Sequence, residues 1–411
     1  MSADRSTVRV SHLDVMHSRT RITSIIGPVR LPDDHVIADR LRVMAAAGPH
    51  ARLGLRPSTR SNRWEFDADA HRPTVTRIDP PASPLDLYDL PTDTDLPADR
   101  RPTSVVLAGD YVRTDHNHGL GEVALALTMH GVILGTIDPS DTAVWQPSRR
   151  RGNGIGTAVA RTYGSDPRRA WALRSSLRRA AASPASVPEI PWAPARAASV
   201  STMPTSTVAG LRVWRDERDP GTSMFAVFAS VLHRSLTAAG VPIDPTATVT
   251  LDARRYLPKG RVPLGNFVSG LEFDLGDAPT PATIHRATAD AMSSGRPVAN
   301  LALNATRTRL GLRAGSDGTH PTARSREPRA RLLFSSIGAV PRHGTIPWLG
   351  TADPFYVAHN DPTGPNGITL TWAIVGGAVT TTASFHGNTF DRAAIQDGLD
   401  RAASDPLGLL P

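Results

Sequence analysis

Polar side chains crowd one short segment of the sequence, residues 115–122, which reads Asp-His-Asn-His-Gly-Leu-Gly-Glu. His116 and His118 are separated by a single residue, and side chains at alternate positions of a strand point to the same side. An imidazole changes its charge near neutral pH, so a histidine here can act as a general acid or base. Neutral imidazole also binds metal ions, and the spacing suits two ligands of one metal. The segment is therefore the first candidate for a functional site.

The residues alone leave three interpretations of this segment open. A His-x-His pair occurs in metal-dependent hydrolases, but such sites need further histidine or carboxylate ligands, and no His-Glu-x-x-His motif accompanies this pair. The two histidines can also lie in a loop without any chemical role. The third interpretation, a general base, depends on a family resemblance described below.

The elements predicted around the segment place it at a junction. Residues 103–113 have the composition of a strand, residues 116–118 form a polar loop, and residues 121–134 are apolar over a length sufficient for a helix. Ligands often bind at loops that a rigid scaffold positions. The rest of the first half is predicted as strand 21–29, helix 33–47, short strands 51–55 and 64–66, and a connection rich in Pro and Asp at 80–102.

A stretch rich in Pro, Ala and Ser divides the chain. We predict a first domain at 1–183, a linker or crossover at 184–204 and a second domain at 205–411. The second half is predicted as strand 206–214, helix 222–239, strands 248–252 and 267–273, helix 281–294, a polar loop at 311–330, strands 332–336, 367–375 and 378–385, and a final helix at 391–403. Both halves are therefore expected to be mixed α/β.

Composition narrows the class of protein. The 411 residues include no cysteine, which excludes disulfides, thiolate nucleophiles and cysteine-ligated metal clusters. No run approaches about 18 apolar residues, and the N-terminal segment lacks the charged-then-apolar order of a signal peptide. We expect a cytoplasmic protein without a transmembrane segment.

The charge balance points to small acidic partners rather than nucleic acid. Lys and Arg number 46 against 38 Asp and Glu, a net charge of +8, but the arginines are scattered except at 149–151 and 324–331. Nucleic-acid binding usually needs a clustered basic face with aromatic residues, which make up only 5% of this chain. A positive field still favours acidic partners such as the phosphates of coenzyme A or an acidic carrier protein.

Residues 104–127, SVVLAGDYVRTDHNHGLGEVALAL, resemble the active-site strand, loop and helix of the condensation-domain acyltransferases, which share the motif HHxxxDG. This superfamily includes nonribosomal peptide condensation domains, polyketide-associated acyltransferases and wax ester synthases. Aligned on Gly121, Asp115 takes the position of the first His, His116 that of the second, and Leu120 that of the Asp. The second His is the catalytic one in the family, so the resemblance implies His116 as the general base, with Asp115, His118 and Gly121 in supporting places.

Three later segments resemble the family in the same order. Residues 222–236 are similar to the helix that opens its second half, and residues 249–275 resemble its Asp-x-Arg, Leu-Pro and Gly-Asn segment. The matching positions there are Asp252, Arg254, Gly265 and Asn266. Residues 332–341 resemble its Ser-Asn-x-Gly segment, with Ser336 where Asn is usual. The resemblance thus spans most of the chain.

The resemblance implies a fold and an activity. The fold is an α/β sandwich of two chloramphenicol-acetyltransferase-like halves, a pseudo-dimer with a tunnel between them. The activity is transfer of an acyl group from a thioester, on coenzyme A or on the phosphopantetheine of a carrier protein, to a small-molecule alcohol or amine. Asn266 and Ser336 become candidates for binding the developing oxyanion, although a structural hydrogen bond explains each equally well. No bound cofactor or metal is expected.

The departures from the motif carry their own expectations. The family's Asp pairs with an arginine that corresponds to Arg254, and Leu120 cannot do so. Since a buried guanidinium needs a partner, we expect Arg254 either to contact another carboxylate, with Asp115, Asp252 and Glu122 as candidates, or to face the tunnel. We also expect Leu120→Asp to be tolerated. Asp115 beside His116 is expected to raise the pKa of that imidazole. A noncatalytic module that recruits a carrier protein is the alternative function, and a metal-dependent hydrolase is the third.

Overall fold

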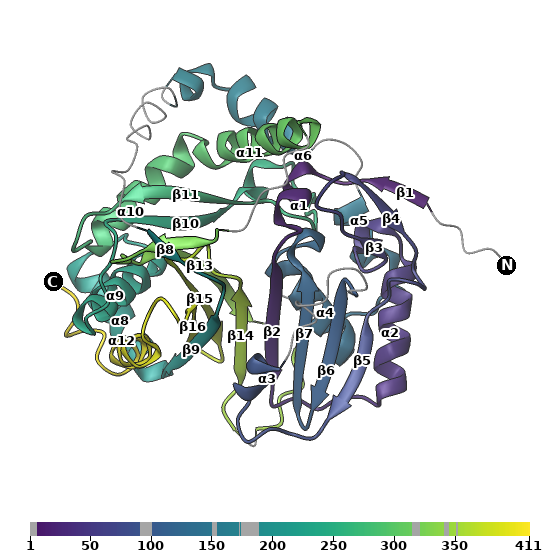
Figure 1. The fold of residues 1–411 in the computed structure, drawn as a ribbon, viewed down its shortest axis with the longest axis horizontal. Coiled ribbons are helices and arrows are strands. Elements are labelled where there is room, and N and C mark those ends of the chain that lie inside the picture. The colour runs from purple at the N-terminus through teal and green to yellow at the C-terminus, as the bar shows by residue number, and fades with distance from the viewer. Residues whose placement is uncertain are drawn as a thin grey trace.

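The computed structural model describes residues 6–90, 101–149, 154–171, 173, 189–314, 321–340, 345–350 and 352–411. Within these residues two large β-sheets lie side by side, each with helices packed on one face (Figure 1). This mixed α/β arrangement in two halves confirms the expected fold class. In the described part of the chain, no helix combines the length and the apolar character that a membrane span requires.

The first sheet has five strands in the order β14-β2-β7-β6-β5. Its strands are β2 (Arg21–Gly27), β5 (Thr74–Ile78), β6 (Thr103–Ala108), β7 (Tyr111–Asn117) and β14 (Phe355–Asn360). One face is covered by α2 (Asp34–Ala46) and α4 (Val123–Leu134). The core between them includes Ile26, Leu41 and Leu125. The short helix α3 (Asp86–Asp89) packs on the opposite face through Leu87.

The second sheet has six strands in the order β11-β10-β13-β15-β16-β9. Its strands are β9 (Arg196–Met203), β10 (Thr246–Asp252), β11 (Val268–Asp274), β13 (Arg331–Val340), β15 (Gly367–Val375) and β16 (Ala378–His386). The helices of this half are α8 (Thr205–Arg218), α9 (Met224–Ala238), α10 (Pro281–Ser293) and α12 (Arg392–Ser404). They enclose a second apolar core that includes Phe228, Trp372 and Phe385.

Smaller elements surround the two sheets. The strands β1 (Ser6–Arg9), β4 (Arg63–Phe66) and β3 (Leu55–Arg56) form a small sheet, and β12 (Ala323–Ser325) pairs with β8 (Glu189–Pro191). Further helices are α1 (His12–His17), α5 (Thr142–Arg149), α6 (Gly154–Val159) and α11 (Arg296–Arg313), and short helical turns occur at Pro49–Ala51, His118–Leu120, Ala160–Gly164 and Ala253–Tyr256. Helix α11 packs against α1, α6 and β11, so it bridges the two halves.

The second half of the chain contributes one strand to the first sheet. β14 belongs to the last third of the chain, yet it pairs antiparallel with β2 of the first sheet, from Phe355 opposite Gly27 to Asn360 opposite Ile22. Val200 of β9 packs against the face of the first sheet that lies opposite α4. This face is therefore turned toward the second half of the molecule.

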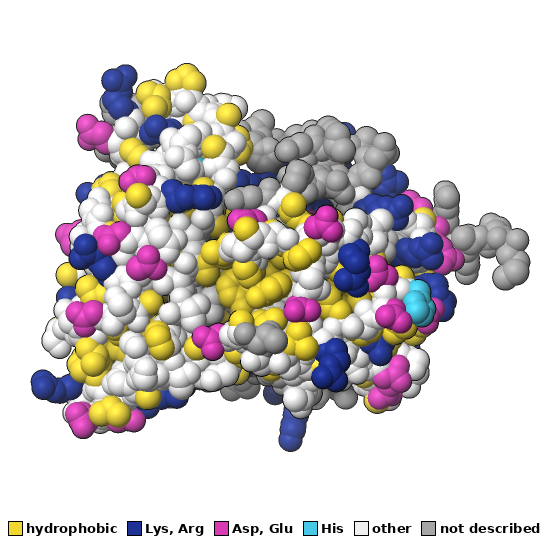
Figure 2. Space-filling model, turned by 90° about the horizontal axis from the view of Figure 1, so that it is seen from below, with side chains coloured by type: hydrophobic (Ala, Val, Ile, Leu, Met, Phe, Trp, Pro, Cys, Tyr) yellow, Lys and Arg dark blue, Asp and Glu magenta, His cyan; other side chains and the backbone are white. Residues whose placement is uncertain are grey.

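The inward face of the first sheet changes character along its strands. Near Gly27 it is apolar, where Ile25 and Val357 pack with Leu87. Viewed from below Figure 1, apolar side chains gather around a hollow in the middle of the molecule (Figure 2). Toward the other end of the strands the buried side chains become polar, with Thr23, Asp115 and His359. The polar end is the one that adjoins residues 118–122.

Most predicted elements of the second half are confirmed, and two regions are corrected. The expected strand 206–214 is the helix α8, in which Val208 and Leu211 are buried three residues apart on one face. The segment predicted as a linker at 184–204 contains β8 and β9, and β9 pairs with β16 along its length; residues 184–188 lie outside the described residues. Helix α11 and strand β14 were not predicted.

Two expectations for the first half are also wrong in detail. The single strand predicted at 103–113 is a hairpin of β6 and β7, which turns at Gly109 with a φ of 55°. A left-handed backbone of this kind favours glycine, and the Gly-Asp pair is a typical turn signal. The strand expected at 51–55 is replaced by the turn Pro49–Ala51 and the two-residue strand β3.

Candidate active site

The segment 115–122 starts in a strand and ends at a helix. β7 includes Asp115 and His116 and ends at Asn117, and His118 begins the 3-10 turn that leads through Gly121 to α4. The side chain of Asn117 accepts a hydrogen bond from the Gly119 amide at 2.9 Å, which caps this turn. His116 therefore lies in the strand and His118 lies beyond its end. The expectation that alternation along one strand points both side chains to the same side does not apply.

His116 faces the helix-covered side of the first sheet. Alternation along β7 places it with Thr114, whose hydroxyl contacts the His130 imidazole of α4 at 3.2 Å. The His116 side chain is 0% exposed, and its Nε2 lies 3.2 Å from the Gly121 carbonyl oxygen. Burial lowers the pKa of His116 to about 4, and the opposing effect of Asp115 is smaller. Asp115 raises this pKa as expected, but burial outweighs its effect.

Asp115 lies on the opposite face and is fully paired. It forms a buried ion pair with Arg21 and accepts a hydrogen bond from the Thr23 hydroxyl at 2.7 Å. Burial raises the pKa of the Asp115 carboxyl, but Arg21 and Arg113 outweigh burial and leave the pKa below its ordinary value. Asp115 thus stays ionised and ties β7 to β2.

His118 differs from His116 in its surroundings. It is partly exposed to solvent, and its ring stacks on His17 of α1 with the ring centroids 4.3 Å apart. Burial lowers the pKa of His118, while Glu122 and Asp361 act in the opposite direction. The imidazole is therefore neutral near pH 7, which is the protonation state that a general base needs.

Glu122 joins the turn to the second half of the molecule. Its carboxylate contacts Arg254 at 2.8 Å, and its Oε1 accepts hydrogen bonds from the amides of Phe267 and Val268, both at 2.7 Å. Arg254 also reaches Asp252 at 3.2 Å. The expectation that Arg254 finds a substitute carboxylate is confirmed, and the partner that is buried with it is Glu122.

Arg254 fills its remaining donors with backbone oxygens. Its Nε donates to the Pro263 carbonyl at 3.0 Å and its Nη2 to the Gly265 carbonyl at 2.8 Å. Burial acts to lower the pKa of Arg254, but Glu122 and then Asp252 raise it above its ordinary value. The guanidinium is thus a fixed structural charge between the turn and the chain that follows β10.

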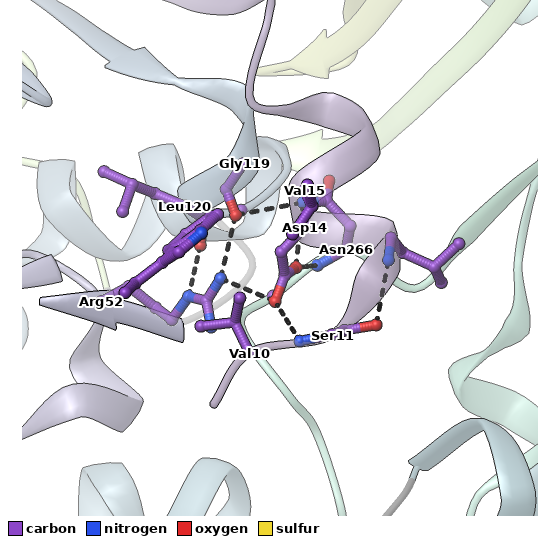
Figure 3. A network of polar contacts seen from close by, with 12 residues as sticks. Val10, Ser11, Asp14, Val15, Arg52, Gly119, Leu120 and Asn266 are labelled. Atoms are coloured by element: carbon purple, nitrogen blue, oxygen red, sulfur yellow. Dashed lines mark hydrogen bonds and ion pairs between the residues drawn. The ribbon is translucent and has the colours of Figure 1, made fainter. Parts of the chain in front are cut away.

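A second polar network holds the turn from the other side (Figure 3). Asp14 of α1 pairs with Arg52 at 3.0 Å. Arg52 donates to the carbonyls of Leu120 at 2.6 Å and Gly119 at 2.9 Å. Asn266 donates from its side chain to Asp14 at 3.2 Å and to the His118 carbonyl at 2.9 Å. These bonds satisfy the carbonyls of an irregular turn that has no ladder to pair with.

This network changes the role of Asn266. Its amide donors are used within the fold, so the oxyanion-binding role considered for it does not fit the structure. Ser336 is exposed on β13, at a β-bulge opposite Trp372. In the described part of the chain, no hydrogen bond or ion pair joins Ser336 to residues 115–122.

The turn needs both of its glycines. A Cβ at Gly121 would lie 2.4 Å from the Leu264 carbonyl oxygen, and one at Gly119 would lie 2.7 Å from the Asp14 carbonyl oxygen. Neither backbone atom can move away without shifting α1 or the chain after β10. The side chain of Leu120, between the glycines, is 0% exposed in the first core.

Three residues of the site were missed by the sequence analysis: Asp14, His17 and Arg52. The only local signal is the capping box at the start of α1, where Ser11 and Asp14 bond each other's backbone. A capping box predicts a helix start but says nothing about a contact with a turn that lies about 100 residues away along the chain. These residues are brought to the site by tertiary packing alone.

Comparisons with known proteins agree on the fold. No family model and no curated protein sequence matches the chain. Among solved structures, it is similar to the TRI3 trichothecene 15-O-acetyltransferase from Fusarium sporotrichioides, with a TM-score of 0.67 and 11% identity over 100% of this chain and 96% of that one. It is also similar to the first condensation domain of the CDA synthetase, with a TM-score of 0.59 and 14% identity over 100% and 97% of the two chains.

A third similar structure is polyketide synthase associated protein 5 from Mycobacterium tuberculosis, with a TM-score of 0.53 and 14% identity over 97% of this chain and 98% of that one. The chain has the condensation-domain fold. At this level of identity the comparisons establish the architecture and leave the reaction to be argued from the site.

Among the described residues, no group of three or more His, Cys, Asp or Glu side chains is placed to hold a metal ion. The metal-dependent hydrolase therefore finds no ligand set in the part of the chain that the structure covers.

The two acidic partners of Arg254, Glu122 and Asp252, should contribute unequally to the free energy of unfolding. Glu122→Gln should lower the free energy of unfolding by about 3–5 kcal/mol, because it leaves the Arg254 charge buried without its main partner. Asp252→Asn is the matched control, since Asp252 is 50% exposed and such a pair is worth about 1 kcal/mol or less. Urea unfolding of both variants measures the difference. Equal costs would contradict the assignment.

The position of Leu120 reverses the expectation for Leu120→Asp. Because Leu120 is enclosed by apolar side chains and Arg254 already has a partner, a carboxylate at this position should destabilise the fold by roughly several kcal/mol. Leu120→Met, of similar volume, should cost less than about 1.5 kcal/mol. Chemical denaturation compares the two variants. An Asp variant as stable as the parent would show that the side chain of residue 120 reaches water or Arg254.

Proposed function

We propose that this protein is an acyltransferase that moves an acyl group from a coenzyme A or carrier-protein thioester to a hydroxyl or amine of a small molecule. The observation that carries the proposal is the half-buried, neutral imidazole of His118 in a turn that two buried ionic networks hold between the halves. The condensation-domain fold supports the same reaction class.

The proposed base is His118 rather than His116. In the family motif the catalytic His precedes the acidic residue by four positions, and that acidic residue pairs with the arginine that corresponds to Arg254. Glu122 makes this pair here, and counting back four positions from Glu122 leads to His118. Alignment on Glu122 instead of Gly121 places Asn117 at the first His. The enclosure of His116 under α4 supports the same register.

The chemistry follows from one imidazole. Neutral His118 accepts the proton of the acceptor hydroxyl or amine while that oxygen or nitrogen bonds to the thioester carbonyl carbon. Collapse of the tetrahedral intermediate breaks the carbon–sulfur bond, and the proton passes from His118 to the departing thiolate. The exposed hydroxyl of Ser336 remains the proposed donor to the oxyanion, since Asn266 is occupied. In this reaction acyl-coenzyme A or the phosphopantetheine thioester is a co-substrate.

A thiol-release assay tests the function directly. Purified protein is mixed with acyl-coenzyme A and carrier-bound thioesters of several chain lengths, with and without pools of alcohols and amines, and the free thiol is measured. Acceptor-dependent thiol release together with an ester or amide product supports the transferase. Tight binding of a loaded carrier without any release would favour the noncatalytic module instead.

The assignment of the base is tested by paired substitutions. His118→Ala should lower kcat roughly 100-fold or more while the free energy of unfolding stays near that of the parent protein. His116→Ala should lower the free energy of unfolding, because it empties a buried position, but the folded enzyme should keep kcat within a few-fold. The opposite pattern, with kcat lost at His116 and kept at His118, would restore the original alignment on Gly121.

The pH dependence has a defined sign. Because the base must be unprotonated, activity is present above its pKa and is lost as the pH falls through it. Burial holds the pKa of His118 below the ordinary value of 6.5, so kcat/KM should stay constant from pH 8 down through pH 6.5 and decline only at more acidic pH. A steady-state pH profile measures this. A decline that begins above pH 6.5 would contradict a desolvated base.

A further inference from the structure

His17 lies against the proposed base, although no part of the motif refers to it. It is the last residue of α1, and the end of that helix is fastened to the turn by several contacts. The Asn117 side-chain amide donates to the Ser18 carbonyl at 2.8 Å, and the His118 amide donates to the Thr20 carbonyl at 2.8 Å. The close approach of Gly119 to α1 completes the junction. The end of α1 that carries His17 is therefore held against the turn that carries His118.

The two imidazoles form a stack. Their centroids are 4.3 Å apart and their planes are inclined by 24°, so one face of the His118 ring is covered by His17. Burial lowers the pKa of His17 well below its ordinary value, and the neighbouring His118 lowers it further. His17 thus stays neutral when His118 accepts a proton. Its contribution to His118 is a covering ring rather than a positive charge.

The other groups that face His118 raise the pKa of its imidazole. Glu122, the backbone carbonyls of His118 and Gly121, and Asp361 beyond the end of β14 all raise the pKa of this imidazole, and burial alone lowers it. On the side of α11, which packs against α1, Arg309 and Arg313 act on His12 and not on His17. Cover from His17 is therefore part of what keeps His118 neutral beside two carboxylates.

We propose that His17 is a positioning residue for the acyl transfer. Its ring holds the plane of the His118 imidazole and excludes water from one of its faces, so that the base stays neutral and oriented toward the acceptor. This inference rests on the proposed function, because it assigns His17 a part in the same reaction.

The test compares variants that keep or remove the ring. His17→Phe keeps an aromatic face, whereas His17→Ala and His17→Gln remove it, and His12→Ala on the same helix is the control. The first measurement needs no substrate: NMR titration of histidine-labelled protein follows the His118 resonances with pH, with the His118→Ala variant used for assignment. The second measurement is the pH profile of kcat/KM for each variant.

The ring-less variants should shift the His118 titration upward toward 6.5, move the acid limb of kcat/KM upward by the same amount, and lower kcat roughly tenfold. His17→Phe and His12→Ala should match the parent protein in both measurements. Titration of His118 that is unchanged in His17→Ala and His17→Gln overturns the inference, and so does a His17→Phe variant that behaves like His17→Ala. A shift in the NMR titration in a protein that transfers no acyl group would support the stacking role while rejecting the proposed function.

Discussion

The buried ion pair between Glu122 and Arg254 is the constraint on which the site depends. Each side chain is about nine-tenths buried, and a buried charge that loses its partner costs several kcal/mol, so separation of the two is strongly disfavoured in the folded protein. Glu122 belongs to the first half and begins α4, whereas Arg254 follows β10 of the second half. The pair therefore fixes the turn that carries His118 at the junction of the halves.

The turn also shows why residue type alone is a poor guide to role. An irregular chain segment leaves its carbonyls without ladder partners, and here Arg52 and Asn266 supply the missing donors. Asn266 has the chemistry of an oxyanion donor, but its amide is used to hold the turn. The imidazole of His118, which we propose as the base, stands on the same turn, and His17 covers one face of its ring.

The contrast between the two histidines has a geometric origin. Within β7 every second side chain points toward α4, and this places His116 with Thr114 and Val112 in the first core. The strand ends at Asn117, and the 3-10 turn that follows redirects the next side chain. His116 is therefore buried in the fold, whereas His118, two residues later, is partly exposed.

Much of this arrangement was determined by the sequence alone: the two mixed α/β halves, the apolar helix after residues 115–122, and the need of Arg254 for a new carboxylate. These features depend on local periodicity or on a charge that must be paired wherever it is buried. The register that we propose for the motif depends on the tertiary structure. The sequence permits alignment on Gly121, which places His116 at the catalytic position, or on Glu122, which places His118 there. The contact between Arg254 and Glu122 favours the second alignment. This contact joins residues that are far apart along the chain, so no local pattern in the sequence predicts it. The same holds for the contacts of Asp14, His17 and Arg52 with the turn.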